Sequence, residues 1–237
     1  MQKKIVFTGG SGRFGQVFKK KPTKEKIYFP NKQQLNIENF ESIKKYLNKI
    51  NPTYLIHAAG LSRPMNIHEK EISKSININI IGTANIVKAC QEKNIKLIYF
   101  STNHVYPGIK GNYKEKDPVL PINKYAVSKL GGECSVQMYS NSLILRICMT
   151  EKPFEHKKAF NNMITNFIFH DEIAKLLPLF YKHTGIINIG GKAQSVYNFA
   201  KKYNSNIKGI VLKKNKNYDL KCNVSMNINK MKKILNV

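Results

Sequence analysis

Several residue types are scarce in this chain of 237 residues, and each scarcity excludes a class of protein. The four cysteines (Cys90, Cys134, Cys148 and Cys222) are widely separated and form no C-x-x-C pair, which argues against a disulfide framework or a zinc site. The six histidines have no ligand-like spacing, so we predict no metal. No apolar run is long enough to span a membrane, and residues 1–8 read as a strand and not as a signal peptide. We expect a soluble, cytoplasmic protein with reduced thiols and no membrane partner.

Acidic residues and arginines are also few. The chain has 14 Asp and Glu against 40 Lys and Arg, a formal charge of +26, and its only arginines are Arg13, Arg63 and Arg146. The basic excess is spread along the whole sequence and accompanies heavy use of Ile and Asn. That distribution favours a compositional bias over a nucleic-acid surface, so we expect no nucleic-acid partner. Because lysine supplies nearly every cation, each arginine marks a position suited to a planar, bidentate group.

Apolar, β-rich runs alternate with amphipathic stretches as far as residue 147. Strand-like runs such as "KIVFTG", "TYLIHAAG", "IKLIYFST" and "SLILRI" are separated by helix-like segments, including residues 76–93 and 121–140. Parallel strands need crossover connections, so this order predicts a doubly wound α/β fold with a parallel sheet. We assign residues 1–150 to a dinucleotide-binding core. Residues 151–237 are expected to form a small substrate lobe with returning core elements, the whole being one compact unit.

The first apolar run ends in "TGGSGRFG", which places glycines at positions 9, 12 and 15. A glycine-rich turn between a strand and a helix lets a pyrophosphate approach the backbone at the helix N-terminus. The same turn also occurs for packing reasons alone. The loop is therefore a candidate dinucleotide site that needs support from elsewhere in the chain.

Tyr125 and Lys129 are four residues apart on a predicted helix, so both side chains fall on one face. A nearby ammonium lowers the pKa of a phenol and makes it a usable acid or base. The chain has three other Y-x-x-x-K pairs, but only Tyr125 follows a strand that ends in Ser101 and Thr102, at the sheet edge that also carries the glycine loop. The alternative is that Tyr125 only packs and Thr102 only caps the strand.

Eight motifs together carry a family resemblance. They are, in order, "TGGSGRFG", "HAAG", "NIIGT", "STNHVYPG", "PINKYAVSKLGGE", "LILR", "FHDEIA" and "GIINIGG". Their order and spacing resemble the extended short-chain dehydrogenase/reductases, and within them the dTDP-4-dehydrorhamnose reductase branch and related nucleotide-sugar-binding proteins. The likeness runs from about residue 3 to residue 235.

The resemblance implies roles for individual residues. Thr102, Tyr125 and Lys129 match the catalytic hydroxyl, acid and lysine of the family, and Lys129 would also bind the nicotinamide ribose. The residues matched to the cofactor site are Gly9, Gly12, Arg13, Phe14, Gly15, Ala58, Ala59, Gly60, Asn79, Ser101 and Lys129. Substrate would meet Arg63, Thr102, Asn103 and His104.

The resemblance also implies a reaction, in which a hydride passes from NAD(P)H to the C4 ketone of a nucleotide-linked 4-keto-6-deoxy sugar while Tyr125 protonates the oxygen. Related dehydratases carry an Asp-Glu pair after the catalytic hydroxyl, and this chain has Asn103-His104. Dehydration is therefore disfavoured. A nucleotide-sugar epimerase and a non-catalytic NADP-binding regulatory subunit stay open as alternatives.

The cofactor preference rests on the end of the second strand. NAD-selecting chains place an acidic residue there, whereas this chain has Pro30, Asn31 and Lys32. We therefore favour NADP(H), with NAD(H) as the alternative, and expect Arg13 to bind the 2′-phosphate. Arg63 is expected to meet the substrate diphosphate, and Arg146 to brace the strand end.

Two further expectations concern the substrate segment and assembly. The stretch between Arg146 and "HDEIA" is shorter than in the resembling family, so the family's sugar and nucleotide pockets cannot be carried over. The helices at residues 76–93 and 121–140 resemble those that pair in family dimers, which predicts a homodimer.

Overall fold

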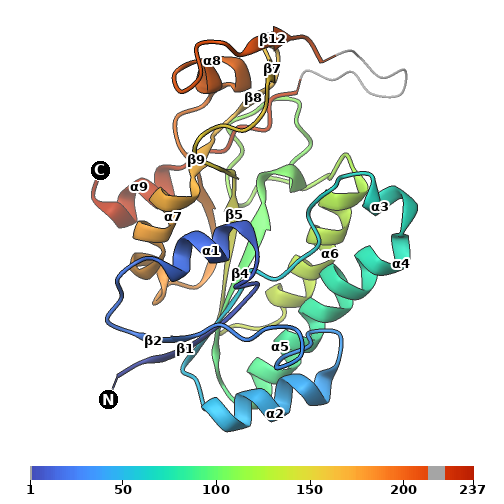
Figure 1. Cartoon of the computed structure of the whole chain (residues 1–237), viewed down its shortest axis with the longest axis vertical. Coiled ribbons are helices and arrows are strands. Elements are labelled where there is room, and N and C mark those ends of the chain that lie inside the picture. The colour runs from blue at the N-terminus through green and yellow to red at the C-terminus, as the bar shows by residue number, and fades with distance from the viewer. Residues whose placement is uncertain (1, 213–221) are drawn as a thin grey trace.

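The core of the computed structural model is a six-stranded parallel sheet with the order β10-β5-β4-β3-β1-β2 (Figure 1). The structure describes residues 2–212 and 222–237. The six strands are Lys4–Thr8 (β1), Lys26–Tyr28 (β2), Tyr54–His57 (β3), Lys96–Thr102 (β4), Ser142–Ile147 (β5) and Gly185–Ile189 (β10). All neighbouring strands run parallel, and the chain leaves β1 first to one side and then to the other. The predicted doubly wound α/β fold is confirmed.

Helices cover both faces of this sheet (Figure 1). One face carries α1 (Arg13–Lys19), α7 (His170–Leu176), the 3₁₀ turn η3 (Leu177–Phe180) and α9 (Asn229–Leu235), and the other carries α2 (Phe40–Ile50), α5 (Gly82–Glu92) and α6 (Lys124–Gln137). Successive strand residues point to opposite faces: Ile5 and Phe7 pack with Phe14 of α1, while Val6 packs with Ile43 of α2. Burial on both sides explains why the strands read as continuous apolar runs.

A smaller lobe lies above the carboxyl edge of the sheet (Figure 1). Its elements are β6 (Met149–Thr150), β7 (Lys158–Phe160), β8 (Ile164–Thr165), β9 (Ile168–Phe169), β11 (Gln194–Ser195), α8 (Val196–Lys201) and β12 (Lys208–Ile210). These strands pair as β7 with β12, β8 with β11 and β6 with β9, around a small aromatic core that contains Phe154, Phe169 and Phe199. The core elements that return within residues 151–237 are α7, β10 and α9.

The structure corrects several expected elements. The helix expected over residues 76–93 begins as a π-helical segment, η1 (Ile76–Ile81), before α5. Helix α7 gives way to the 3₁₀ turn η3 at Leu177, because Pro178 has no N–H to continue the α-helical ladder. Three single-turn elements were not predicted: α3 (Ile67–Lys70), α4 (Ile72–Ser75) and the 3₁₀ turn η2 (Asn103–Val105).

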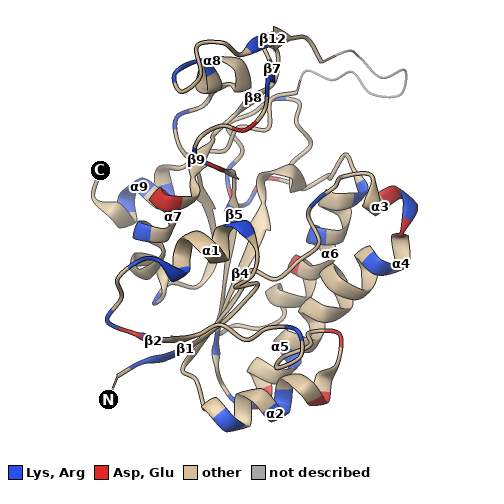
Figure 2. Cartoon of the chain, in the orientation of Figure 1, with Lys and Arg blue, Asp and Glu red and all other residues tan. Residues whose placement is uncertain are grey.

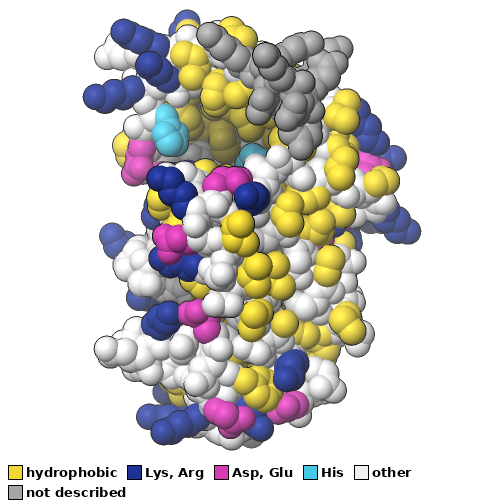
Figure 3. Space-filling model, turned by 90° about the vertical axis from the view of Figure 1, so that its right-hand side faces the viewer, with side chains coloured by type: hydrophobic (Ala, Val, Ile, Leu, Met, Phe, Trp, Pro, Cys, Tyr) yellow, Lys and Arg dark blue, Asp and Glu magenta, His cyan; other side chains and the backbone are white. Residues whose placement is uncertain are grey.

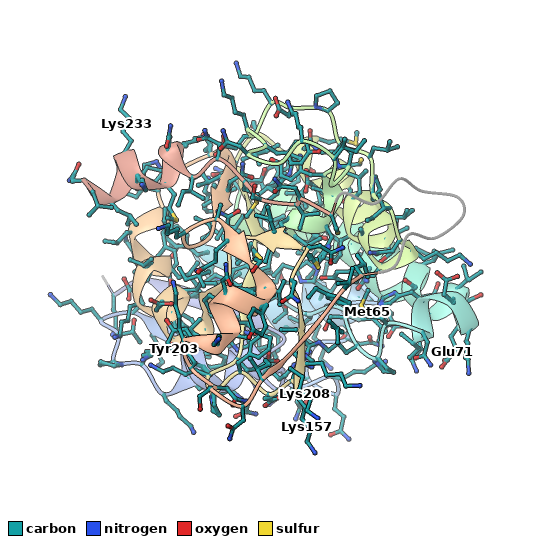
Figure 4. The ribbon with its side chains drawn as sticks, turned by 90° about the horizontal axis from the view of Figure 1, so that it is seen from above. Met65, Glu71, Lys157, Tyr203, Lys208 and Lys233 are labelled. Carbon is teal, nitrogen blue, oxygen red and sulfur yellow. The ribbon has the colours of Figure 1, made fainter. Side chains whose placement is uncertain are left out.

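Lys and Arg residues are spread over most elements of the fold (Figure 2). Lys157, which precedes β7, and Lys208 of β12 lie next to each other and point outward from the rim of the lobe (Figure 4). The helices within residues 2–212 and 222–237 include none long and apolar enough to cross a membrane.

Candidate active site

A cleft of about 570 Å³ opens at the carboxyl edge of the sheet, between the core and the lobe. Its walls come from the glycine loop after β1, the loop after β3, the end of β4 with the first turns of α6, and the lobe. Figure 3 shows the hollow, with hydrophobic side chains in its depth and histidine side chains near its rim. The cleft lies where the chain order reverses in the sheet, the place at which open α/β sheets bind ligands. Among the predicted site residues, it is lined by Gly9, Gly12, Arg13, Phe14, Gly15, Ala58, Gly60, Arg63, Ser101, Thr102, Asn103, His104, Tyr125 and Lys129.

The glycine loop is shaped by close backbone contacts. Gly9 has φ +83°, and a Cβ there would lie 2.6 Å from the backbone nitrogen of Ala59. A Cβ at Gly15 would run into the carbonyl oxygen of Gly9 and lie 2.7 Å from the Cα of Gly10. At Gly12, by contrast, the only atom within 4 Å of an added Cβ is that same carbonyl oxygen, at 3.2 Å. Gly9 and Gly15 thus allow tight packing of β1, α1 and the β3 loop, and Gly12 faces the cleft.

Tyr125 and Thr102 form the centre of the cleft. Tyr125 lies in the first turn of α6, whose start is capped by the Asn123 side chain, and it lines the cleft together with Thr102 at the end of β4. The rings of His68 and His104 flank the Tyr125 ring, at centroid distances of 5.2 and 6.5 Å. The structure thus brings this tyrosine and the strand-end hydroxyl into one cleft.

The charge environment of Tyr125 differs from the one expected. Burial raises the pKa of Tyr125 above 10, and the hydrogen bond from Thr102 and the charges of Arg63 and Arg13 only partly oppose it. Lys129 is not among the groups that lower it, which corrects the expectation that its ammonium would favour the phenolate. Tyr125 therefore stays protonated at neutral pH.

Lys129 lies one turn further along α6 and is buried. Its ammonium nitrogen is 4.2 Å from the ring centroid of Tyr99, and Glu133 follows one more turn along the helix. Burial lowers the pKa of Lys129 to about 7, although the charge of Glu133 acts in the opposite direction. The side chain accordingly loses most of its positive charge just above neutral pH.

Asn79 braces the wall of the cleft and does not line it. Its side chain accepts a hydrogen bond from the Leu61 N–H (2.7 Å) and donates to the Leu61 carbonyl (2.9 Å) and to Ser128 Oγ (2.8 Å). Ser128 in turn donates to the Tyr125 carbonyl. Ala59 likewise stays behind the cleft wall, with its N–H directed to Thr8 Oγ1 at 3.4 Å. Asn79 thus fixes the β3 loop to the helix that carries Tyr125.

A buried ionic network lies directly beneath Ser101. The Ser101 hydroxyl donates to Glu133 (2.5 Å), and Glu133 pairs with Arg146 of β5, also at 2.5 Å. Arg146 further donates to the Tyr106 hydroxyl at 2.8 Å. Ser101 therefore lines the cleft while its hydroxyl is engaged inward. Arg146 braces the ends of β4 and β5, as the sequence predicted.

Asn103 and His104 both line the cleft, but they face different partners. Asn103 donates to Thr165 of β8 (3.2 Å) and so ties the end of β4 to the lobe. The backbone N–H of His104 donates to Thr102 Oγ1 at 3.2 Å, and burial lowers the pKa of its ring. His104 is therefore neutral at pH 7 and adds no carboxylate-like base beside Thr102.

Arg13 and Arg63 meet at one acidic residue that the sequence interpretation missed. Glu151, just after β6, places Oε1 2.7 Å from Arg13 Nη1 and 3.6 Å from Arg63 Nη1. Burial raises the pKa of Glu151, but the hydrogen bond from its own backbone N–H and the charges of Arg63, Arg13 and His170 together hold it below the usual range. The carboxylate is ionised at neutral pH and lies between two guanidinium groups.

These contacts do not support the predicted 2′-phosphate role of Arg13. Its guanidinium is directed toward Glu151, on the β5 side of the cleft, whereas the end of β2 lies at the opposite edge of the sheet. Lys19 does lie near that end, with its ammonium 5.2 Å from the ring centroid of Phe29. Arg63 also lines the cleft, and its guanidinium faces Glu151.

A family model described as "RmlD substrate binding domain" matches residues 3–172. The chain belongs to this family. The RmlD family match covers strands β1 to β5 of the central sheet and continues along the chain through β9 into α7, so it includes every residue predicted for the site. The likeness to extended short-chain dehydrogenase/reductases inferred from the motifs is thereby confirmed.

Curated relatives of this RmlD-family chain are distant. The dTDP-4-dehydrorhamnose reductase of Aggregatibacter actinomycetemcomitans is 27% identical over 152 residues, which is 62% of this chain and 51% of that protein. "Methionine adenosyltransferase 2 subunit beta" of Rattus norvegicus is 24% identical over 143 residues, 56% of this chain and 42% of that protein. The chain thus spans about half the length of the curated relatives it matches.

Solved structures show the same fold over nearly the whole chain. A dTDP-4-dehydrorhamnose reductase from Bacillus anthracis, solved in complex with NADP, superposes with a TM-score of 0.85 at 22% identity and covers 100% of this chain and 93% of its own. WbmG of Bordetella bronchiseptica, solved with NAD, gives a TM-score of 0.76 at 14% identity and covers 100% and 88%.

The RmlD-family cleft also contains residues that were not predicted. Beyond Glu151, its lobe side is lined by Cys148, Met149, His156, Phe160, Met163, Thr165, Phe167 and His170. These residues follow Arg146, in a segment whose strands are only two or three residues long. Strands this short show no clear alternation of polar and apolar residues, so the sequence did not reveal which side chains face the cleft. Glu151 had a readable signal, since it is one of only 14 acidic residues and follows a predicted strand end. Within the described part of the chain, no three His, Cys, Asp or Glu residues converge as a metal site.

Proposed function

We propose that this protein is an NADPH-dependent reductase of a nucleotide-linked 4-keto-6-deoxy sugar, of the dTDP-4-dehydrorhamnose reductase type, that serves polysaccharide precursor synthesis. The observation that carries the proposal is the convergence of Thr102, Tyr125 and Lys129 on the cleft that also contains the glycine loop. Membership of the RmlD family and the fold shared with dTDP-4-dehydrorhamnose reductases support it.

The cleft fits a dinucleotide. Gly9 and Gly15 occupy positions where a Cβ would strike backbone, and Gly12 leaves open space toward the cleft, so a diphosphate can approach this loop. Gly60 and Ala58 line the neighbouring β3 loop, where Gly60 faces Lys129. The cofactor would supply the hydride. The proposed preference for NADP(H) is supported by the absence of an acidic residue at the end of β2 and by Lys19 beside Phe29.

Tyr125 is suited to give a proton to the oxygen of a ketone being reduced. Its raised pKa keeps the hydroxyl protonated at neutral pH, and the Thr102 hydroxyl lines the same cleft. A ketone oxygen placed between the two hydroxyls would accept hydrogen bonds from both as negative charge develops. Phe14, Phe100 and Met149 line the same cleft and reduce access of water to this point.

The residues beside Thr102 favour reduction over dehydration. Asn103 is engaged by Thr165, and His104 is neutral, so neither supplies the carboxylate base that water elimination from a sugar requires. On the lobe side, Phe160, Met163 and Phe167 give the substrate half of the cleft an apolar and aromatic wall, suited to contact with a sugar ring or a nucleobase. The identity of the nucleotide is left to experiment.

Activity is tested by following NADPH oxidation when a dTDP-linked 4-keto-6-deoxyhexose is added to the purified protein. We expect Tyr125→Phe to lower turnover by about 100-fold or more, because it removes only the donated proton, while NADPH affinity stays within about two-fold. Tyr197→Phe is the matched control, since Tyr197 and Lys201 have the same spacing on α8, outside the cleft.

Three other outcomes would contradict the proposed reductase. Normal turnover in Tyr125→Phe would remove this hydroxyl from the mechanism. Conversion of the sugar without net NADPH oxidation would identify an epimerase, and NADPH binding with no turnover would identify a binding subunit.

The proposal also includes a homodimer and a cytoplasmic location. Ile76 and Ile81 of η1 and Val127 of the adjacent α6 are exposed by 40%, 45% and 50%, and hydrophobic side chains run along this side of the molecule (Figure 3). These three residues, called the helix face below, support a homodimer formed through η1 and α6. All four cysteines are free, which supports a location in the reducing cytoplasm.

A further inference from the structure

The contact between Glu151 and two arginines joins three walls of the cleft. Arg13 begins α1, Arg63 lies in the loop after β3, and Glu151 follows β6, so three separate parts of the chain meet at one carboxylate oxygen. Both arginine side chains are about two fifths exposed (42% and 43%), whereas that of Glu151 is 13% exposed. The arginines are thus accessible from the cleft while the carboxylate is largely shielded by them.

Charge at this point is only partly compensated. Two guanidinium groups face a single carboxylate, which leaves the cluster with a net positive charge, and the neighbouring His170 also faces Glu151. Each guanidinium has five N–H donors, and one carboxylate cannot engage all the donors of two such groups; Glu151 Oε1 lies nearest to Nη1 of each arginine. The remaining donors are available to a planar or tetrahedral anion, and phosphate oxygens match that fork.

The ligands of the proposed function would occupy the same cleft as this cluster. Arg13 belongs to the glycine loop and Arg63 to the substrate side, and both line the same cleft as Tyr125. A dinucleotide and a nucleotide-linked sugar each carry a diphosphate, which is the group that both halves of the cleft have in common.

We propose that Arg13 and Arg63 form one binding site for the diphosphate of a bound nucleotide, and that Glu151 competes with those phosphates for both guanidinium groups. This inference rests on the proposed function for the identity of the ligands. When phosphate oxygens take the arginine donors, Glu151 loses its partners and becomes a nearby like charge. Part of the binding free energy is then spent on separating the ion pairs. Glu151 would set how tightly the cleft holds its ligands and favour those with two charged phosphates.

Affinity measurements on Glu151→Gln test the competition directly. This variant keeps the size and most hydrogen bonds of the side chain but removes its charge. Affinities for NADPH, for dTDP and for inorganic pyrophosphate are measured by calorimetry at fixed ionic strength. We expect pyrophosphate, and whichever of NADPH and dTDP supplies the bound diphosphate, to bind this variant about 10-fold more tightly. An effect of this size is typical of removing one like charge from a partly buried anion site. The first two probes show whether the diphosphate comes from the cofactor or from the substrate.

Two further variants separate the effect of Glu151 from that of net charge and folding. Glu92→Gln makes the same charge change at an exposed ion pair with Lys44, at the C-terminal end of α5, and should leave all three affinities unchanged. Glu151→Asp keeps the charge but shortens the reach to the arginines, so it should tighten binding less than Glu151→Gln. Circular dichroism confirms that each variant is folded.

The outcomes distinguish this inference from the proposed function. Unchanged or weaker binding of every probe by Glu151→Gln would overturn the competition, even if the wild type binds NADPH and reduces the sugar. Equal tightening in Glu92→Gln would reduce the effect to net charge and overturn it as well. If the wild type binds pyrophosphate but not NADPH and Glu151→Gln binds it more tightly, the competition stands and the proposed function fails.

Discussion

Lys129 is a basic side chain whose environment opposes its charge. It is 7% exposed and faces the Tyr99 ring, so its ammonium loses hydration that the contact with the ring only partly restores. Its pKa is about 7 in the folded protein and 10.5 in the unfolded chain. Between these values the unfolded chain binds a proton that the folded protein does not, so the stability contributed by this group rises with pH from 7 to 10.5 and is constant below 7.

This gives a prediction that does not depend on catalysis. We expect Lys129→Met to be more stable than the wild type at pH 6, and the difference to shrink by about 1.4 kcal/mol per pH unit above pH 7. Urea unfolding at pH 6, 8 and 10 measures it. Lys124→Met, at an exposed position on the same helix, is the control and should show no such trend. A constant difference between Lys129→Met and the wild type would mean that Lys129 stays charged when buried.

At the scale of single residues, the sequence predicted which side chains share the cleft, but it did not predict their charge states. The i,i+4 spacing and the strand-end context were enough to select Tyr125, Lys129 and Thr102. The pKa of Tyr125 was misjudged because burial, which outweighs the neighbouring charges, is a property of the whole cleft. Glu151 was missed because its partners, Arg13 and Arg63, are more than 80 residues away in the chain.

Among the elements, the packing of α1 against its glycine loop depends on the absence of a Cβ at Gly15. In Gly15→Ala the new Cβ would strike the carbonyl of Gly9, which is backbone and cannot move without displacing β1 or α1. We expect a loss of about 1–3 kcal/mol in unfolding free energy, together with weaker NADPH binding. Thermal unfolding and NADPH titration measure the two effects.

Gly12→Ala is the matched variant on the same loop. Its Cβ meets only one atom within 4 Å, at 3.2 Å, and projects toward the cleft. It should keep nearly normal stability and lose NADPH affinity by about 10-fold, a steric effect of one methyl group on a close approach. If Gly12→Ala instead unfolds as readily as Gly15→Ala, the loop is a packing turn and not a cofactor cradle.

The strongly patterned elements were predicted best. The buried strands β1, β3, β4 and β5 and the helix α2 carry apolar patterns over enough residues to show their period. The π-helical segment η1 continues an apparently helical pattern, so its altered winding leaves no trace in the sequence. The strands of the lobe have only two or three residues, and their pairing is determined by packing above the sheet and not by local propensity.

On the scale of the whole molecule, the surface is strongly basic yet contains one apolar area on the helix face. Lys and Arg residues lie on most elements, and the formal charge of +26 opposes the association of copies of the chain. Ile76, Ile81 and Val127 interrupt this surface on helices that pack directly on each other. Val127 is also two residues from Tyr125, so a partner on this face would hold the helix that carries the proposed acid.

The homodimer can therefore be tested by changing the helix face alone. We expect the wild type to be a dimer in light scattering, and Val127→Glu to be a monomer, because an unpaired carboxylate in the interface costs more than the apolar contact it replaces. Leu179→Glu is the control: Leu179 is 56% exposed, but it lies on η3, which covers the opposite face of the sheet, so this variant should remain a dimer. Val127→Glu should also lose turnover in proportion to its dissociation if the partner steadies α6. A wild type that scatters as a monomer at all concentrations would exclude the homodimer, while dissociation in both variants would place the contact elsewhere and attribute the effect to added charge.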